Sequence, residues 1–128
     1  MVFVVPKALG IQGDLIIALQ NNLTIAFGAA VITLNRTREE LGIQLPDPIA
    51  DERDQCVALV YQLRNAFAHD IAEPTWKING RYRRSYMFQG IRVDLSGLNG
   101  TAFEYGHIGG PDALFRIKDF FAAKFIQH

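Results

Sequence analysis

Hydrophobic positions recur at helical spacing along much of the chain, and polar breaks set the limits of the predicted helices. The first stripe consists of residues three or four apart, namely Leu15, Leu19, Leu23, Phe27, Ala30, Val31 and Leu34. Since such residues share one helix face, the stripe predicts a long helix over residues 8–40. This helix is predicted to end before Gly42 and the "LPDP" that follows, because proline lacks an amide donor and restricts the residue before it.

Two further stripes predict a second helix over residues 50–70 and a last helix over residues 111–126. The second helix begins with acidic residues and carries apolar residues at Cys56, Leu59, Val60, Leu63 and Phe67. Pro111 suits the first position of the last helix, where its missing N–H costs nothing. Antiparallel helices joined by a short loop are a natural half of a helical bundle.

After Pro74 the chain becomes rich in aromatic and β-branched residues, which favours a small antiparallel sheet over residues 75–95. Strands are predicted at 75–78, 82–88 and 91–95. Asn79-Gly80 is a preferred hairpin-turn pair, with Gly90 as a second turn or a bulge. The glycine-rich segment 96–110 should be a loop. The expected fold is mainly α, an antiparallel helical bundle with a small β-hairpin or meander inserted before the last helix.

Length and composition narrow the class of protein. A chain of 128 residues with 49% hydrophobic content is the size of one domain, 1–128. Its 13 basic and 13 acidic residues cancel, so an anion site must come from a local cluster of charge. Cys56 is the only cysteine and is expected to be a buried thiol, which predicts a reducing, cytoplasmic location.

Neither apolar stretch near the N-terminus is predicted to enter a membrane. "MVFVVPK" lacks the charge and length of a signal peptide. Residues 14–34 approach spanning length, but Gln20, Asn21 and Asn22 interrupt them, so a buried soluble helix is expected. The alternative, a membrane-associated helix, would require detergent during purification.

The histidines and arginines carry the candidate chemistry. The chain has no phosphate-binding glycine loop, nucleophile elbow or zinc-spaced pair, so neither a metal nor a cofactor is predicted. His107 stands alone in the glycine-rich loop. His69 differs, because "RNAFAHD" also contains Arg64, Asn65 and Asp70 at the end of the second helix.

Arg64 and His69 suit phosphodiester chemistry, since arginine offers a charged planar fork and histidine exchanges protons near neutral pH. Five residues correspond to about 140° of helix rotation, so the two side chains converge only if the helix ends near Ala68. Cleavage of RNA through its own 2′-hydroxyl needs a base, an acid and a cation. One histidine can act as either the base or the acid, but not as both at once. A symmetric homodimer, which brings two copies of Arg64 and His69 together, is therefore the simplest way to assemble the base, the acid and the cation.

"RNAFAH" resembles the Arg-x4-His motif of the HEPN (higher eukaryotes and prokaryotes nucleotide-binding) superfamily. The resemblance implies a compact helical bundle and a metal-independent endoribonuclease, in which both protomers contribute to one cleft. It makes Arg64 and His69 catalytic, with Asn65 in support. Asp70, directly after His69, is a further supporting candidate that the motif does not include. Ile71 replaces a tyrosine of many toxin members, and the segment from 75 to 95 lies outside the minimal bundle. Both differences indicate a divergent branch with lost or changed activity.

A second candidate surface follows the motif, where basic and aromatic residues alternate: Lys77, Arg81, Arg83 and Arg84 with Trp76, Tyr82 and Tyr86. Cations track phosphates and aromatic faces stack on bases, so this segment could hold single-stranded RNA. The alternative is a solvated hairpin face with its aromatic rings packed on the helices, which strand alternation favours.

Two functions are therefore considered. The first is an RNA-cleaving or RNA- or nucleotide-binding HEPN-like protein with a composite dimer site. The second is a non-catalytic dimeric interaction protein that keeps the fold for a protein partner. A structural account of "RNAFAHD" also stands, in which Arg64 pairs with an acidic residue, His69 lies near the helix dipole and Asp70 begins a turn.

Overall fold

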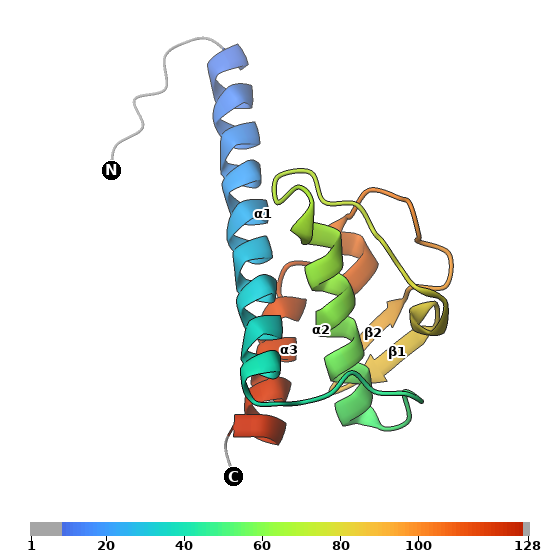
Figure 1. Ribbon diagram of the computed structural model, residues 1–128. Helices are drawn as coiled ribbons and strands as arrows, with labels where there is room; N and C mark the ends of the chain where they lie inside the picture. Colours follow the sequence, from blue (N-terminus) through green and yellow to red (C-terminus); the bar gives the residue numbers. More distant parts are fainter. Residues whose placement is uncertain (1–8, 127–128) are drawn as a thin grey trace.

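The computed structural model describes residues 9–126, with side chains from residue 22 onward (Figure 1). Its main elements are α1 (Leu9–Glu40), α2 (Glu52–Ala68), β1 (Ser85–Phe88), β2 (Ile91–Asp94) and α3 (Ala113–Phe121). A π-helical turn, Ala122–Ile126, extends α3. The predicted class, mainly helical with a small antiparallel sheet, is confirmed. Within these residues, no helix combines the length and the apolar character needed to cross a membrane.

α2 is the central element, since α1 and α3 pack on it and the β1–β2 hairpin packs on its other side (Figure 1). Five consecutive residues, from Cys56 to Val60, are all buried, as expected of a helix covered on several sides. Its start is well defined by a capping box, in which the Asp54 N–H donates to the Asp51 carboxylate at 2.8 Å. The helix runs antiparallel to α1 (Figure 1).

The end of α2 approaches α1 closely at Gly28. A Cβ atom at this position would lie 2.5 Å from Cδ1 of Phe67 and 2.6 Å from Cγ1 of Ile71. Only glycine leaves room for these two side chains. The segment that carries the candidate motif is therefore fixed against the middle of α1.

The sheet differs from the prediction. It has two strands, with Phe88 opposite Ile91 and Gln89-Gly90 as the two-residue turn. The predicted turn at Asn79-Gly80 and the strand at 75–78 are wrong, because that segment pairs with the glycine-rich loop instead. The Trp76 N–H donates to the Thr101 carbonyl at 2.9 Å, and Gly80 begins a short 3₁₀ helix, Gly80–Tyr82.

The core lies between α2, the inner face of the hairpin and the surrounding loops. Alternate strand residues point into it, so that Tyr86, Phe88, Ile91 and Val93 are buried while their neighbours are exposed. The last helix starts at Ala113, not at Pro111, whose carbonyl accepts from the Leu114 N–H in a preceding turn. The register of the hairpin thus places four large side chains under α2 and α3.

Candidate functional site

The "RNAFAHD" segment forms the last turn of α2 and the start of the loop after it. The helix ends at Ala68, two residues before the predicted limit at 70, but His69 keeps helical backbone angles of φ −82° and ψ −41°. It therefore continues the helical path and remains about 140° of rotation away from Arg64. No hydrogen bond joins Arg64 and His69, and Arg64 is not among the residues that line the pocket at His69.

Arg64 and Asn65 form a pair of their own. Both side chains are half-buried, and the Arg64 Nη1 donates to Oδ1 of Asn65 at 3.1 Å. The expected ion pair between Arg64 and an acidic residue is not formed with any residue from 22 to 126. Asn65 thus restrains the guanidinium of Arg64, which has no carboxylate partner among residues 22–126.

His69 lies at a shallow pocket of about 240 Å³, lined also by Asp70, Glu73, Thr75 and Lys77. The imidazole is exposed and makes no hydrogen bond or ion pair with another described residue. Lys77, a candidate RNA contact, is exposed beside it. The structure therefore brings His69 and Lys77 to one pocket and leaves Arg64 outside its lining.

Asp70 organises the loop that forms this pocket. Its Oδ1 accepts hydrogen bonds from the N–H groups of Ala72 at 3.0 Å and Glu73 at 3.1 Å. These bonds are those of an Asx turn, in which a short carboxylate substitutes for a backbone acceptor. Two N–H donors partly offset the negative charge of Asp70, whereas the exposed Glu73 carboxylate opposes an anion in the same pocket.

The other basic residues that were candidate RNA contacts bind to neighbouring loops and strands of the protein itself. Arg81 lies 3.8 Å from Asp47 and stacks over the Tyr82 ring, 4.7 Å from its centroid. Arg83 donates to the Ile78 carbonyl, and Arg84 donates to the carbonyls of Ser85 and Ile49. Each guanidinium thus has a structural partner.

The aromatic candidates in the same segment are part of the core. Trp76 is fully buried and Tyr82 is 2% exposed. Burial raises the pKa of the Tyr82 hydroxyl, although Arg81 nearby lowers it in part. Because neither ring presents an open face, stacking on a base would require these rings to leave the core.

His107, which appeared isolated in the sequence, is joined to Trp76. The indole Nε1 donates to Nδ1 of His107 at 2.9 Å, and the Glu104 N–H donates to the same nitrogen at 3.2 Å. Nε2 lies 3.4 Å from the Glu104 carboxylate. The ring nitrogen that accepts has no proton, so the neutral ring carries its proton on Nε2.

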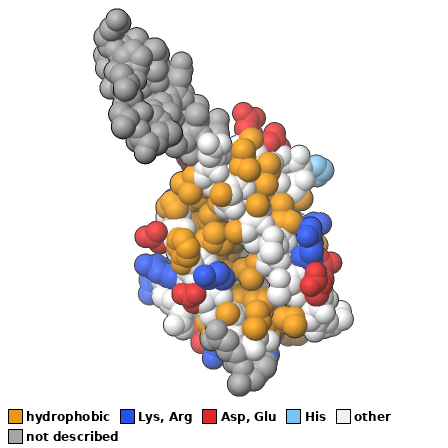
Figure 2. Space-filling view, turned by 90° about the vertical axis from the view of Figure 1, so that its left-hand side faces the viewer, with side chains coloured by type: hydrophobic (Ala, Val, Ile, Leu, Met, Phe, Trp, Pro, Cys, Tyr) orange, Lys and Arg blue, Asp and Glu red, His pale blue; other side chains and the backbone are white. Residues whose placement is uncertain are grey.

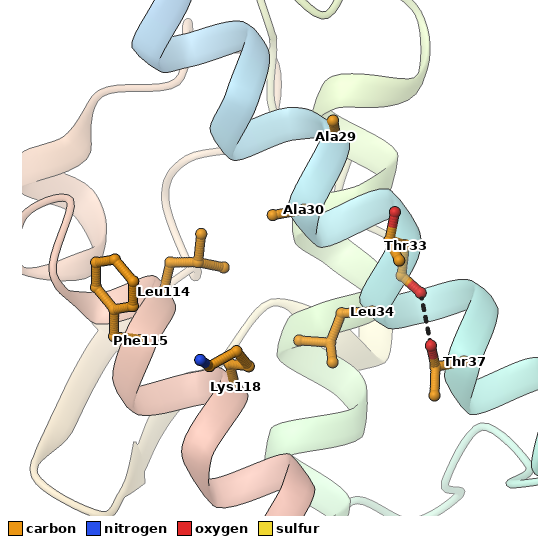
Figure 3. A pocket seen from close by; sticks show the side chains of 8 residues that line it. All are labelled: Ala29, Ala30, Thr33, Leu34, Thr37, Leu114, Phe115 and Lys118. Carbon is orange, nitrogen blue, oxygen red and sulfur yellow. Dashed lines mark hydrogen bonds between the residues drawn. The ribbon is translucent and has the colours of Figure 1, made fainter.

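An apolar groove between α1 and α3 is a feature that the sequence did not predict. It has a volume of about 450 Å³, and its walls include Ala30, Thr33 and Leu34 of α1 and Leu114, Phe115 and Lys118 of α3 (Figure 3). Figure 2 shows hydrophobic side chains gathered along this side of the molecule. The sequence signal was available, since Ala26, Ala30, Thr33 and Thr37 recur at helical spacing, but Ala30 was assigned to the apolar stripe of the first predicted helix.

Comparisons of the chain with family models, curated proteins and solved structures find no match. Among the residues from 22 to 126, no three or more His, Cys, Asp or Glu side chains are grouped to hold a metal ion.

Proposed function

We propose that this chain is an RNA-cleaving or RNA- or nucleotide-binding protein of the HEPN type, an antiparallel helical bundle with a composite site at a homodimer interface. The observation that carries the proposal is the environment of His69. Its imidazole is exposed, unpaired among the described residues and beside Lys77 at one pocket. A histidine in this state is available for proton transfer, and a neighbouring ammonium group suits a phosphate.

The divergence of Arg64 and His69 supports a site that is shared by two protomers. On one chain, His69 and Lys77 line the pocket, while Arg64 is outside its lining and donates to Asn65. A second copy would supply the missing guanidinium and a second imidazole, so that one histidine acts as base and the other as acid. The buried Cys56 agrees with the reducing, cytoplasmic setting that we propose for this reaction.

The test is digestion of single-stranded RNA with and without a chelator. We expect cleavage by the native chain in both conditions, and a loss of about 100-fold or more in His69→Ala and Arg64→Ala, the scale of general acid–base catalysis. Lys77→Ala should weaken RNA binding. Arg92→Ala is the control, because Arg92 is exposed on β2 and makes no hydrogen bond or ion pair with another described residue. Cleavage that survives both His69→Ala and Arg64→Ala would refute the catalytic proposal.

The apolar groove favours a second candidate, a non-catalytic dimeric interaction protein that keeps the same fold. In that case, the native chain binds neither RNA nor nucleotides, and His69→Ala lowers the stability of the fold. The RNA proposal expects the reverse, since His69 is exposed and its replacement removes no hydrogen bond to a described residue. Thermal unfolding of His69→Ala, measured beside RNA binding, therefore separates the two candidates.

A further inference from the structure

A second pocket adjoins the pocket at His69. Glu73 and Thr75 line both pockets, so the two are neighbours on the surface. The second pocket has a volume of about 380 Å³ and lies where the loop after α2 pairs with the glycine-rich loop. Its lining also includes Pro74, Ala102, Phe103 and Tyr105. A pocket that suits a phosphate thus adjoins a pocket with two aromatic rings in its wall.

The two aromatic rings are held by the core and still reach this pocket. Phe103 and Tyr105 are half-buried, and their rings meet edge-on at 5.2 Å between centroids. The Tyr105 ring also meets the Phe27 ring of α1 edge-on, at 5.2 Å. A base that enters the pocket would therefore contact rings already in position, unlike the buried Trp76 and Tyr82.

The backbone fixes Glu73 at the boundary of the two pockets. Before it, the Asx turn holds its N–H on Oδ1 of Asp70, at 3.1 Å. After it, Pro74 is buried, and the Pro74 carbonyl accepts from the Phe103 N–H at 2.9 Å. The Glu73 side chain is exposed, and its carboxylate makes no hydrogen bond or ion pair with a residue from 22 to 126. A carboxylate beside a phosphate pocket needs a donor elsewhere on the ligand.

The bases of RNA differ in the donors that they offer to a carboxylate. The two oxygens of a carboxylate lie side by side and pair best with two parallel N–H donors. Guanine presents two such donors, N1–H and the N2 amino group, on its Watson–Crick edge. Adenine and cytosine present one amino group beside an acceptor nitrogen, and uracil presents one N–H between two acceptor oxygens. These three bases would turn an acceptor toward the carboxylate, so Glu73 favours guanine.

We propose that the second pocket binds an unpaired guanine against Phe103 and Tyr105, with the Glu73 carboxylate accepting from N1–H and the N2 amino group. This guanine site rests on the proposed function, since a phosphate next to the guanine lies at His69 and Lys77. A guanine in a base pair does not fit, because its partner occupies the edge that Glu73 contacts. Glu73 is thus a residue that determines specificity.

The test is an NMR titration of the full chain with the four ribonucleoside 3′-monophosphates and with inosine 3′-monophosphate. The guanine nucleotide should bind about tenfold or more tightly than the adenine, cytosine and uracil nucleotides, the scale of one bidentate contact. The inosine nucleotide lacks the N2 amino group and should lose part of this advantage.

Glu73→Gln separates recognition from charge repulsion. In this variant, the guanine nucleotide should bind more weakly, because an amide offers only one acceptor. The adenine, cytosine and uracil nucleotides should bind more tightly, because a negative charge has left the phosphate pocket. Glu40→Gln is the matched control, since Glu40 is an exposed glutamate at the end of α1, and it should change nothing.

Equal binding of the guanine and adenine nucleotides by the native chain would overturn the inference. So would a Glu73→Gln variant in which all five nucleotides bind more tightly, since the carboxylate would then act by repulsion alone. Cleavage of single-stranded RNA next to all four bases alike would refute the guanine site and leave the RNA proposal standing. Conversely, a guanine preference in binding without cleavage of RNA would refute the catalytic proposal only.

Discussion

At the scale of single residues, His107 connects parts of the chain that are distant in sequence. One ring nitrogen accepts from the buried Trp76 indole and from the Glu104 backbone, which fixes the loop after β2 to the core. A buried indole N–H that loses its acceptor is costly, because no solvent replaces the bond.

We therefore expect His107→Ala to lower the free energy of unfolding by about 1–3 kcal/mol, the cost of an unsatisfied buried donor. His107→Asn should lose less, since its amide oxygen can accept near the position of Nδ1. His69→Ala is the matched control, because His69 is exposed and should leave stability unchanged. Urea denaturation followed by the emission of Trp76, the single tryptophan, measures all three. Equal losses in His107→Ala and His107→Asn would contradict the role of the acceptor.

The sequence predicted some of these residue environments and not others. Cys56 was expected to be a buried thiol because it lies on the apolar stripe of α2, and burial indeed raises its pKa to about 12. In the structural alternative for "RNAFAHD", Asp70 begins a turn, and its carboxylate indeed accepts the N–H groups of Ala72 and Glu73. The partnership of His107 and Trp76 was not predictable, because it joins residues 31 positions apart through tertiary structure.

At the scale of elements, the β1–β2 hairpin shows how tertiary contacts override a local turn preference. Asn79-Gly80 is the better turn pair, yet the hairpin turns at Gln89-Gly90, with φ angles of 50° and 77°. The residues before Asn79 bond to the glycine-rich loop, where the Ile78 N–H also donates to Oδ1 of Asn99 at 2.8 Å. A non-glycine residue with positive φ has a strained backbone, so Gln89 lowers the stability of the hairpin turn.

Replacing Gln89 with asparagine should therefore stabilise the protein by about 0.5–1 kcal/mol, because asparagine tolerates positive φ better than glutamine. The reciprocal change, Asn79→Gln, should have little effect, since Asn79 has an extended backbone and its side chain makes no capping hydrogen bond to the short 3₁₀ helix that follows. Thermal and urea unfolding of both variants provide the measurement. The absence of a gain in Gln89→Asn, or a clear loss of stability in Asn79→Gln, would contradict the placement of the turn at Gln89-Gly90.

At the scale of the whole molecule, an aromatic cluster joins the two long helices to the glycine-rich loop. The Phe103 ring lies 5.7 Å from Phe27 of α1, 5.0 Å from Phe67 of α2 and 5.5 Å from Trp76, between ring centroids. The periodicity of apolar residues predicted the helices, because helical spacing is a local signal. It could not predict this cluster, because a glycine-rich segment carries no period that marks Phe103 as a core residue.

We expect this aromatic cluster to make the molecule unfold as one unit. The fluorescence of Trp76 reports on the unfolding of the glycine-rich loop. The far-ultraviolet circular dichroism reports mainly on the helices. Since Phe103 contacts both, the two signals should share one urea midpoint, as in a two-state transition. Phe103→Ala should lower both urea midpoints together, with a loss of up to about 3 kcal/mol in the free energy of unfolding, because its half-buried ring packs against the core and leaves a cavity when removed. If the tryptophan signal changes first while the helical signal persists, the loop is an independent layer and the helices hold the candidate motif without it.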